Sequence, residues 1–296
     1  MLQYVLNGVI TASVLGLAGL GFVFQHRLAK FFNFSYASTF LVAPYACWVV
    51  LQGLPRSSTA MFFVAALVGV GCSVLFGLAL EISLFRRLRI RGGGVLVPLL
   101  VSLGAYVAVQ NAISLFAGDD TKVVWSGPAR TGREVRVGPA VGRITDAQLV
   151  TLAVTVLVGG ATIAMVGKTN LGLVLRAVAD DSHLARVQGL NTNVIHMYAQ
   201  GVASAIAGVA GLCSAIQTDL NPNVGLEVLL TVAAVMAIGG VVSLPGVLTG
   251  ALALGLLESF SPLVADNRWQ DTIVFGLLLV LLVVRPSGLL GRITDS

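Results

Sequence analysis

Charged side chains are scarce in this chain. Only 10% of its 296 residues are Asp, Glu, Lys or Arg, and 56% are hydrophobic, whereas a soluble domain carries about 25% charged residues. This shortage excludes an ordinary soluble domain. The apolar runs are continuous rather than alternating, which favours membrane-spanning helices over strands. We therefore expect an integral membrane protein that lies in the lipid bilayer.

Cysteine and histidine are also scarce. Each occurs three times: Cys47, Cys72 and Cys213, and His26, His183 and His196. The cysteines lie within apolar runs and the histidines are far apart in the sequence, so the spacing fits neither a metal site nor a disulfide framework. We expect no bound metal and no cofactor.

Motifs for catalysis and nucleotide binding are missing. The chain contains no G-x-x-x-x-G-K-[ST] stretch, which is the loop that binds nucleotide phosphates, and no nucleophile–base pair. Charges are nearly absent from the centres of the apolar runs, where one charge costs ~2.5–3.5 kcal/mol and is kept only for a function such as ion coupling. We expect neither an enzyme nor an ion-coupled carrier, so the energy for active transport would come from a separate chain.

Glycine, by contrast, is abundant: 34 residues is well above the usual ~7%. Small residues let membrane helices pack closely. The predicted fold is all-α, a polytopic transmembrane helical bundle of about eight or nine spans in a single domain over residues 1–296. The predicted spans are 2–24, 34–52, 59–84, 94–117, 147–167, 194–217, 226–241, 246–261 and 269–285. The seventh and eighth are short and broken by glycine, so they form either two half-spans or a re-entrant hairpin.

Lysine and arginine in the short loops set the orientation. Loops 25–33 and 85–93 are basic and are predicted to be cytoplasmic. Alternation then places 168–193 and the C-terminus on the cytoplasmic side and the N-terminus outside. The loop 118–146 falls outside, and its pattern suggests a short β-hairpin or lid, either a surface for an external partner or a structured loop without one. We interpret the net charge of +5 as this cytoplasmic bias and expect no nucleic-acid partner.

The most polar interior stretch is 168–193. Asn170 is placed to cap a short helix, Asp181 or Ser182 to cap a second one, and Gly189 to end the second helix in the left-handed conformation. The stretch therefore predicts two short helices with a bend near Asp180-Asp181. Spacing alone leaves two interpretations open, a connector between two spans and a docking element for a cytoplasmic partner.

Five motifs occur along the chain in a fixed order. They are Phe31–Ser38, Leu80–Gly92, a pattern of Gly172, Arg176, Ala177, Asp180 or Asp181, Ala185 and Gly189-Leu190-Asn191, then Gly239–Leu252 and Arg285–Arg292. Together they resemble bacterial ABC-importer permeases of the branched-chain amino-acid type. The resemblance implies the permease fold of these importers and a multi-pass protein of the bacterial plasma (inner) membrane. It also implies an ATPase-coupling role for Gly172, Arg176, Ala177, Asp180, Asp181, Ala185 and Gly189.

The same resemblance implies a set of partners. They are cytoplasmic ATP-binding subunits, a second permease subunit in a homodimer or heterodimer, and an external solute-binding protein. ATP hydrolysis would then take place on a separate chain, and the binding protein would set most of the solute specificity.

Uncharged polar residues within the spans are candidates for a translocation path. The candidates are Asn7, Thr11, Asn33, Ser35 and Tyr36. A neutral polar path would let a zwitterion pass without binding it tightly, and Pro44 in the second span could expose backbone groups to it. The same side chains could instead bond across helices as packing contacts worth ~0.6 kcal/mol each.

At two places the sequence departs from the family pattern, and these departures leave the identity of the transported solute open. Ser35-Tyr36-Ala37 stands where the family has Ala-His-Gly, and Val241-Val242 stands where glycine is common. The expected function is the membrane-spanning permease subunit of an importer for a branched-chain or other amino acid. The alternatives are a permease for urea or a short amide, a passive channel for a small neutral solute, and a membrane scaffold or enzyme subunit.

Overall fold

The computed structural model describes residues 1–53, 59–92, 94–124, 132–137, 140–240, 243–263 and 276. Its helices are α1 (Leu2–Ala29), α2 (Ser35–Gln52), α3 (Thr59–Leu80), α4 (Arg86–Ile90), α5 (Leu96–Ala117), α6 (Asp146–Lys168), α7 (Asn170–Asp180), α8 (Ser182–Val187), α9 (Thr192–Thr218), α10 (Val224–Gly239) and α11 (Leu244–Phe260). A π-helical turn (Glu81–Phe85) joins α3 to α4, and a 3-10 turn (Ser261–Leu263) follows α11.

The helical bundle predicted from the sequence is confirmed. Within the described ranges, six helices are long and apolar enough to cross a membrane: Leu2–Ala29, Ala60–Ile90, Leu96–Ala117, Asp146–Lys168, Thr192–Thr218 and Leu244–Leu263. Eight of the nine predicted spans fall on helices, and only residue 276 of the ninth, 269–285, is described. The motif Arg285–Arg292 lies outside the described residues.

The short seventh and eighth ranges form two separate helices, α10 with 16 residues and α11 with 17. The two helices pack against each other, and α11 also runs along α1. Ser243 caps α11 through its hydroxyl, which accepts from the Gly246 N–H at 3.1 Å, and a proline in the first turn suits a helix start. The break between the two helices therefore has a local cause, a cap followed by proline.

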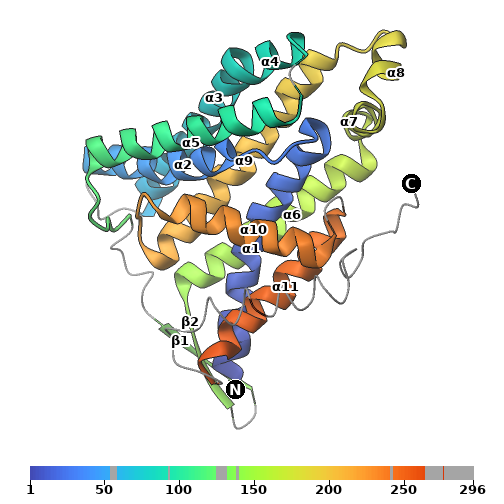
Figure 1. Cartoon of the computed structure of the whole chain (residues 1–296). Helices are drawn as coiled ribbons and strands as arrows, with labels where there is room; N and C mark the ends of the chain where they lie inside the picture. Colours follow the sequence, from blue (N-terminus) through green and yellow to red (C-terminus); the bar gives the residue numbers. More distant parts are fainter. Residues whose placement is uncertain are drawn as a thin grey trace.

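Two helices form the centre of the bundle. In their most apolar stretches α1 is 67% buried and α9 72%, whereas α5 is only 11% buried. Helix α1 contacts α9, α10 and α11, while α2 lies against α3 and α9, as Figure 1 shows. The exposed apolar side chains of α3 and α5 suit a surface that faces lipid or another membrane protein.

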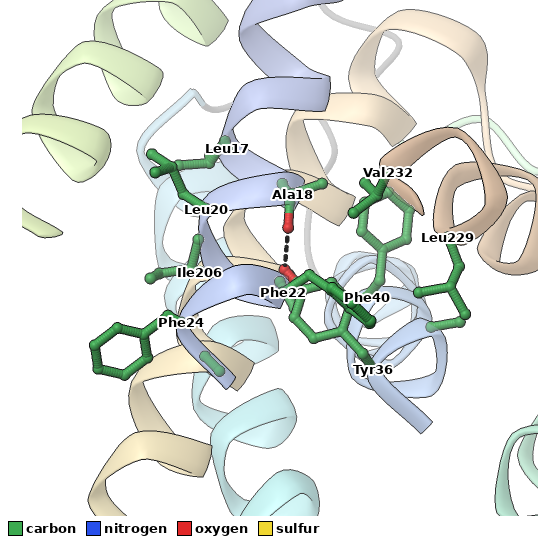
Figure 2. Packing of buried hydrophobic residues seen from close by; sticks show 14 of the residues in the cluster. Leu17, Ala18, Leu20, Phe22, Phe24, Tyr36, Phe40, Ile206, Leu229 and Val232 are labelled. Atoms are coloured by element: carbon green, nitrogen blue, oxygen red, sulfur yellow. Dashed lines mark hydrogen bonds between the residues drawn. The ribbon is translucent and has the colours of Figure 1, made fainter. Parts of the chain in front are cut away.

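The start of α2 is tied to the middle of α1. The Tyr36 hydroxyl donates to the Ala18 carbonyl at 2.7 Å, and its ring meets Phe22 edge-on at 5.3 Å between centroids. Figure 2 shows this bond inside a cluster with Phe40 and with Leu229 of α10. Helix α2 continues through Pro44 to Gln52, so the proline does not interrupt it.

The two ends of the molecule differ in structure. In Figure 1, α4, α7 and α8 lie at one end, whereas the N-terminus and a β-hairpin lie at the other. The hairpin is the antiparallel pair β1 (Gly132–Val137) and β2 (Ala140–Thr145), which confirms the hairpin predicted within 118–146. Gln3 anchors it to α1, because its side chain accepts from the Arg143 N–H at 2.8 Å and donates to the Arg143 carbonyl at 3.1 Å.

Candidate functional site

A single residue, Thr169, separates α6 from α7. Its hydroxyl donates to the Met165 carbonyl in the last turn of α6 at 2.6 Å and accepts from the Gly172 N–H in the first turn of α7 at 3.1 Å. One side chain therefore ends one helix and caps the next. The prediction that Asn170 is the cap was wrong by one position, because Asn170 is already the first residue of α7.

Gly172 lies where α7 folds back on α6. A Cβ atom at this position would overlap the carbonyl oxygens of Met165 and Val166. Any larger residue would therefore push α7 away from the end of α6. The resemblance implies a coupling role for Gly172; within the structure its close neighbour is the preceding helix.

The junction between α7 and α8 is capped as the sequence predicts. The Asp181 carboxylate accepts from the backbone N–H groups of His183 at 2.8 Å and Leu184 at 3.0 Å. These bonds to Leu184 and His183 hold the pKa of Asp181 below its ordinary value of 3.8, because they stabilise the charged form. Asp181 is thus the cap, and Ser182 is the first helical residue.

Helix α8 ends at the predicted glycine. Gly189 has a φ of +86°, its N–H donates to the Arg186 carbonyl at 3.0 Å, and the Leu190 N–H donates to the Ala185 carbonyl at 3.1 Å. This pair of bonds is the Schellman arrangement. Asn191 then caps α9 through a bond from the Val194 N–H at 3.4 Å. Caps or terminators thus fix each junction from α6 to α9.

The α7–α8 pair presents one buried and one exposed face. Leu175, Val178 and Ala185 point into the protein, whereas Leu173 is 63% exposed and Val187 75% exposed. Exposed leucine and valine beside charged residues, at the polar end of a membrane protein, are typical of a surface that a partner covers.

The seven predicted coupling residues divide between these faces. Gly172 and Ala185 are buried, and the others are exposed: Arg176, Ala177, Asp180, Asp181 and Gly189. The Arg176 Nε donates to the Gly172 carbonyl at 3.2 Å, and among the described residues its guanidinium forms no ion pair. Lys30 at the end of α1 donates to the Asp180 carbonyl at 3.4 Å, which ties α7 to α1.

The five candidates for the translocation path do not form one cluster. Asn7 is exposed and accepts from Gln3 at 3.0 Å, and Thr11 is half-buried one turn further along α1. Asn33, Ser35 and Tyr36 are each no more than 2% exposed. The Asn33 Oδ1 accepts from the Ser35 N–H at 3.0 Å and from its hydroxyl at 2.7 Å. In this conformation the last three are interior contacts, and their role in transport stays a prediction.

Sequence reasoning missed a polar cluster where α1, α9 and the π-helical turn meet. The Gln25 amide of α1 donates to Gln200 of α9 at 2.5 Å, and Glu81 in the π-helical turn pairs with Arg89. Glu81 is 3% exposed, and burial of a carboxylate needs such a partner. The sequence did hold a signal for the Glu81–Arg89 pair, because a cluster of arginines follows Glu81 at the end of a predicted span. No pattern in the sequence links Gln25 to Gln200.

The side chains at the site can bind a partner. Within the described ranges, no group of three or more His, Cys, Asp or Glu side chains could hold a metal ion. The exposed face of α7–α8 offers two arginines, two aspartates and several aliphatic side chains, which suits contact with a protein.

Comparisons with known proteins identify the family of the chain. The family model "Branched-chain amino acid transport system / permease component" matches residues 4–283. The high-affinity branched-chain amino acid transport system permease protein BraD of Pseudomonas aeruginosa is 27% identical over 98% of this chain and 96% of its own length. LivH of Escherichia coli K12, with the same description, is 26% identical over the same shares.

A solved structure, PsaBC from Streptococcus pneumoniae in complex with Fab, aligns with 96% of this chain and 91% of its own chain, at 16% identity and a TM-score of 0.46. The family match extends over nearly the whole helical bundle and supports the importer interpretation rather than the channel or urea alternatives. The chain is a multi-pass membrane protein and belongs to the permease components of branched-chain amino acid transport systems.

Proposed function

We propose that this chain is one of the two permease subunits of an ABC importer in the bacterial inner membrane, and that it carries a branched-chain or another amino acid inward. The relatives named for branched-chain amino acid transport support this solute class. The α7–α8 pair would dock a cytoplasmic ATP-binding subunit.

The observation that carries the proposal is the combination of rigidity and exposure at α7–α8. Thr169 caps the start of α7, Asp181 caps the start of α8 and Gly189 ends α8. Leu173 and Val187 remain exposed. A rigid element passes a partner's movement into the membrane helices, whereas a flexible loop would absorb it. Helix α6 ends one residue before this pair and α9, the most buried helix, begins after it, so displacement of α7–α8 would reach both membrane helices.

The remaining partners of the importer are part of the proposal. A second permease subunit, identical or different, would cover part of the exposed apolar surface of α3 and α5. An external solute-binding protein would dock at the end that holds the N-terminus and the β1–β2 hairpin. In this orientation the N-terminus is outside, and a membrane-impermeant thiol reagent should label Ser182→Cys only from the cytoplasmic side.

Co-purification of the ATP-binding subunit tests the docking role. Arg176→Glu reverses the exposed charge on α7, and we expect the ATP-binding subunit to be lost from the purified complex while the permease stays in the membrane. The loss of one partner of a buried charge pair at an interface costs ~2–5 kcal/mol, which is enough to dissociate a complex on a column. Arg143 belongs to β2, and β2 lies at the opposite end of the molecule from α7 and α8 in Figure 1. Arg143→Glu is therefore the matched control and should retain the subunit.

Normal retention by Arg176→Glu, with normal solute-stimulated ATP hydrolysis, would contradict the proposal. The α7–α8 pair would then be a connector between α6 and α9.

A further inference from the structure

A pocket of about 200 Å³ lies where α7 meets the end of α1 and the last turns of α6. Its apolar lining comes from three helices: Phe24 and Leu28 of α1, Val166 of α6 and Leu175 of α7. These four side chains are between 2% and 9% exposed, so their positions are fixed by packing. The pocket is therefore part of the folded protein and lies directly behind the proposed docking surface.

Charged groups of both signs complete the lining. Arg27 of α1 and Arg176 and Asp180 of α7 all line the pocket. They lie close enough for Asp180 and Arg176 to be the charged groups that act on Arg27. An apolar surface thus stands beside two guanidinium groups and one carboxylate.

This combination selects a particular ligand chemistry. A guanidinium binds a carboxylate through paired hydrogen bonds, a carboxylate binds an ammonium group, and the four apolar side chains would accept an aliphatic chain. The volume is below the ~300–1,000 Å³ of usual small-molecule pockets, so the occupant is a single small molecule rather than a nucleotide. Urea has neither charge nor an aliphatic chain, so it matches neither the charged nor the apolar half of the lining.

We propose that this pocket is a regulatory site that binds an aliphatic α-amino acid from the cytoplasm and restrains α7. The proposal rests on the function proposed above, because it assigns the transported solute class to a second site next to the docking surface. The carboxylate of the amino acid contacts Arg27 and Arg176, its ammonium group contacts Asp180, and its side chain packs on Leu28 and Leu175.

The position of the pocket links a bound ligand to the movement of α7 and so to the rate of ATP hydrolysis. Its walls belong to α1 and α6 on one side and to α7 on the other, so a movement of α7 relative to α1 changes its shape. A ligand that bridges these walls binds one conformation better and shifts the population toward it. Because the ATP-driven cycle needs α7 to move, a filled pocket slows ATP hydrolysis. An importer with this site would slow down as its product accumulates in the cell.

The test begins with equilibrium binding of radiolabelled leucine to the purified full-length permease, in detergent and without a solute-binding protein. Leucine should bind at millimolar concentration. Three competitors should be weak: 4-methylpentanoate lacks the ammonium group, 3-methylbutylamine lacks the carboxylate, and glycine lacks the side chain. Arg27→Gln should weaken leucine binding by roughly tenfold or more, the loss expected for a hydrogen bond to a charged group. Arg87→Gln removes an exposed arginine of α4 that belongs neither to the pocket lining nor to the α7–α8 pair, and this variant should bind leucine normally.

The competing ligands are measured on the native chain, so the test remains informative even if a variant fails to fold. Absence of leucine binding to the native chain, or equal binding by native and Arg27→Gln chains, overturns the proposal. Displacement of leucine by glycerophosphoethanolamine as effectively as by isoleucine also overturns it, because the pocket would then be a lipid-headgroup site.

A second readout separates this proposal from the docking role. In the complex with the ATP-binding subunit, leucine should lower ATP hydrolysis in native and Arg87→Gln chains but not in Arg27→Gln. An ATP-binding subunit that stays attached and is unaffected by leucine contradicts the regulatory site alone. If the native chain binds leucine as expected but Arg176→Glu still retains the ATP-binding subunit, only the docking role is contradicted.

Discussion

The α7–α8 pair and the start of α2 were both predicted as functional sites, yet their structures differ. In α7–α8 the side chains that cap the helices bond to neighbours a few residues away, and the outer face is exposed. At the start of α2 the Tyr36 hydroxyl reaches a carbonyl 18 residues away, and the segment is fully enclosed. The first region is therefore suited to contact with a partner chain, and the second holds two membrane helices together.

The largest effect that separates the two regions is expected at Gly172. Gly172→Leu would force its side chain against the carbonyl groups of Met165 and Val166, so α7 would leave its position and the ATP-binding subunit would be lost. Gly167→Leu is the matched control, because a Cβ there meets no atom within 4 Å, and it should retain the subunit. Comparable retention by the two variants in a pull-down would mean that the position of α7 does not matter for docking.

The start of α2 should respond in the opposite way. Asn33→Ala leaves the buried Ser35 N–H without the acceptor that it has at 3.0 Å, and an orphaned buried donor costs ~1–3 kcal/mol. We expect a lower melting temperature for the purified permease and unchanged retention of the ATP-binding subunit. Transport per folded molecule, measured over a range of solute concentrations, tests the path role; a normal rate together with lower stability would assign Asn33 to packing alone.

A smaller effect is expected at Tyr36. Tyr36→Phe removes the hydroxyl but leaves the Ala18 carbonyl free to accept within its own helix, so no group is orphaned. The cost should be near the ~0.6 kcal/mol average for hydrogen bonds between membrane helices. Thermal unfolding of the purified variant measures it, and a loss as large as that of Asn33→Ala would show that this cross-helix bond is worth more than its geometry indicates.

The smallest effect is expected from titration of Asp181. Its pKa is lowered by the bonds from Leu184 and His183, so its contribution to the α8 cap is complete above the ordinary pKa of 3.8 and is lost only as the pH falls through the lower folded value. Between about pH 8 and about pH 5 the carboxylate stays charged. Asp181→Asn, which still caps a helix, should therefore have the native pH profile of subunit retention, measured in a His183→Gln background to remove the imidazole.

The contrast between the regions also explains what the sequence could predict. Helix caps depend on residues two to four positions apart, so Asp181, Gly189 and the bend between α7 and α8 followed from local pattern, with an error of one position at Asn170. The spans followed from apolar runs. Contacts between distant residues, such as Tyr36 with Ala18, depend on the packing of whole helices, and a single sequence carries no pattern for them. The pocket at Arg27 was missed for the same reason, because its lining comes from three helices.

Site-directed cross-linking tests the central claim most directly. After Cys72, the one half-buried cysteine, is replaced by alanine, a cysteine is placed at Ala177 on the exposed face of α7 or at Asn7 near the opposite end, and a short thiol-reactive cross-linker is added to the assembled complex. We predict that Ala177→Cys cross-links to the ATP-binding subunit and that Asn7→Cys does not. A cross-link from Asn7→Cys, or none from Ala177→Cys in a complex that still holds the subunit, would contradict the assignment of α7–α8 as the docking site.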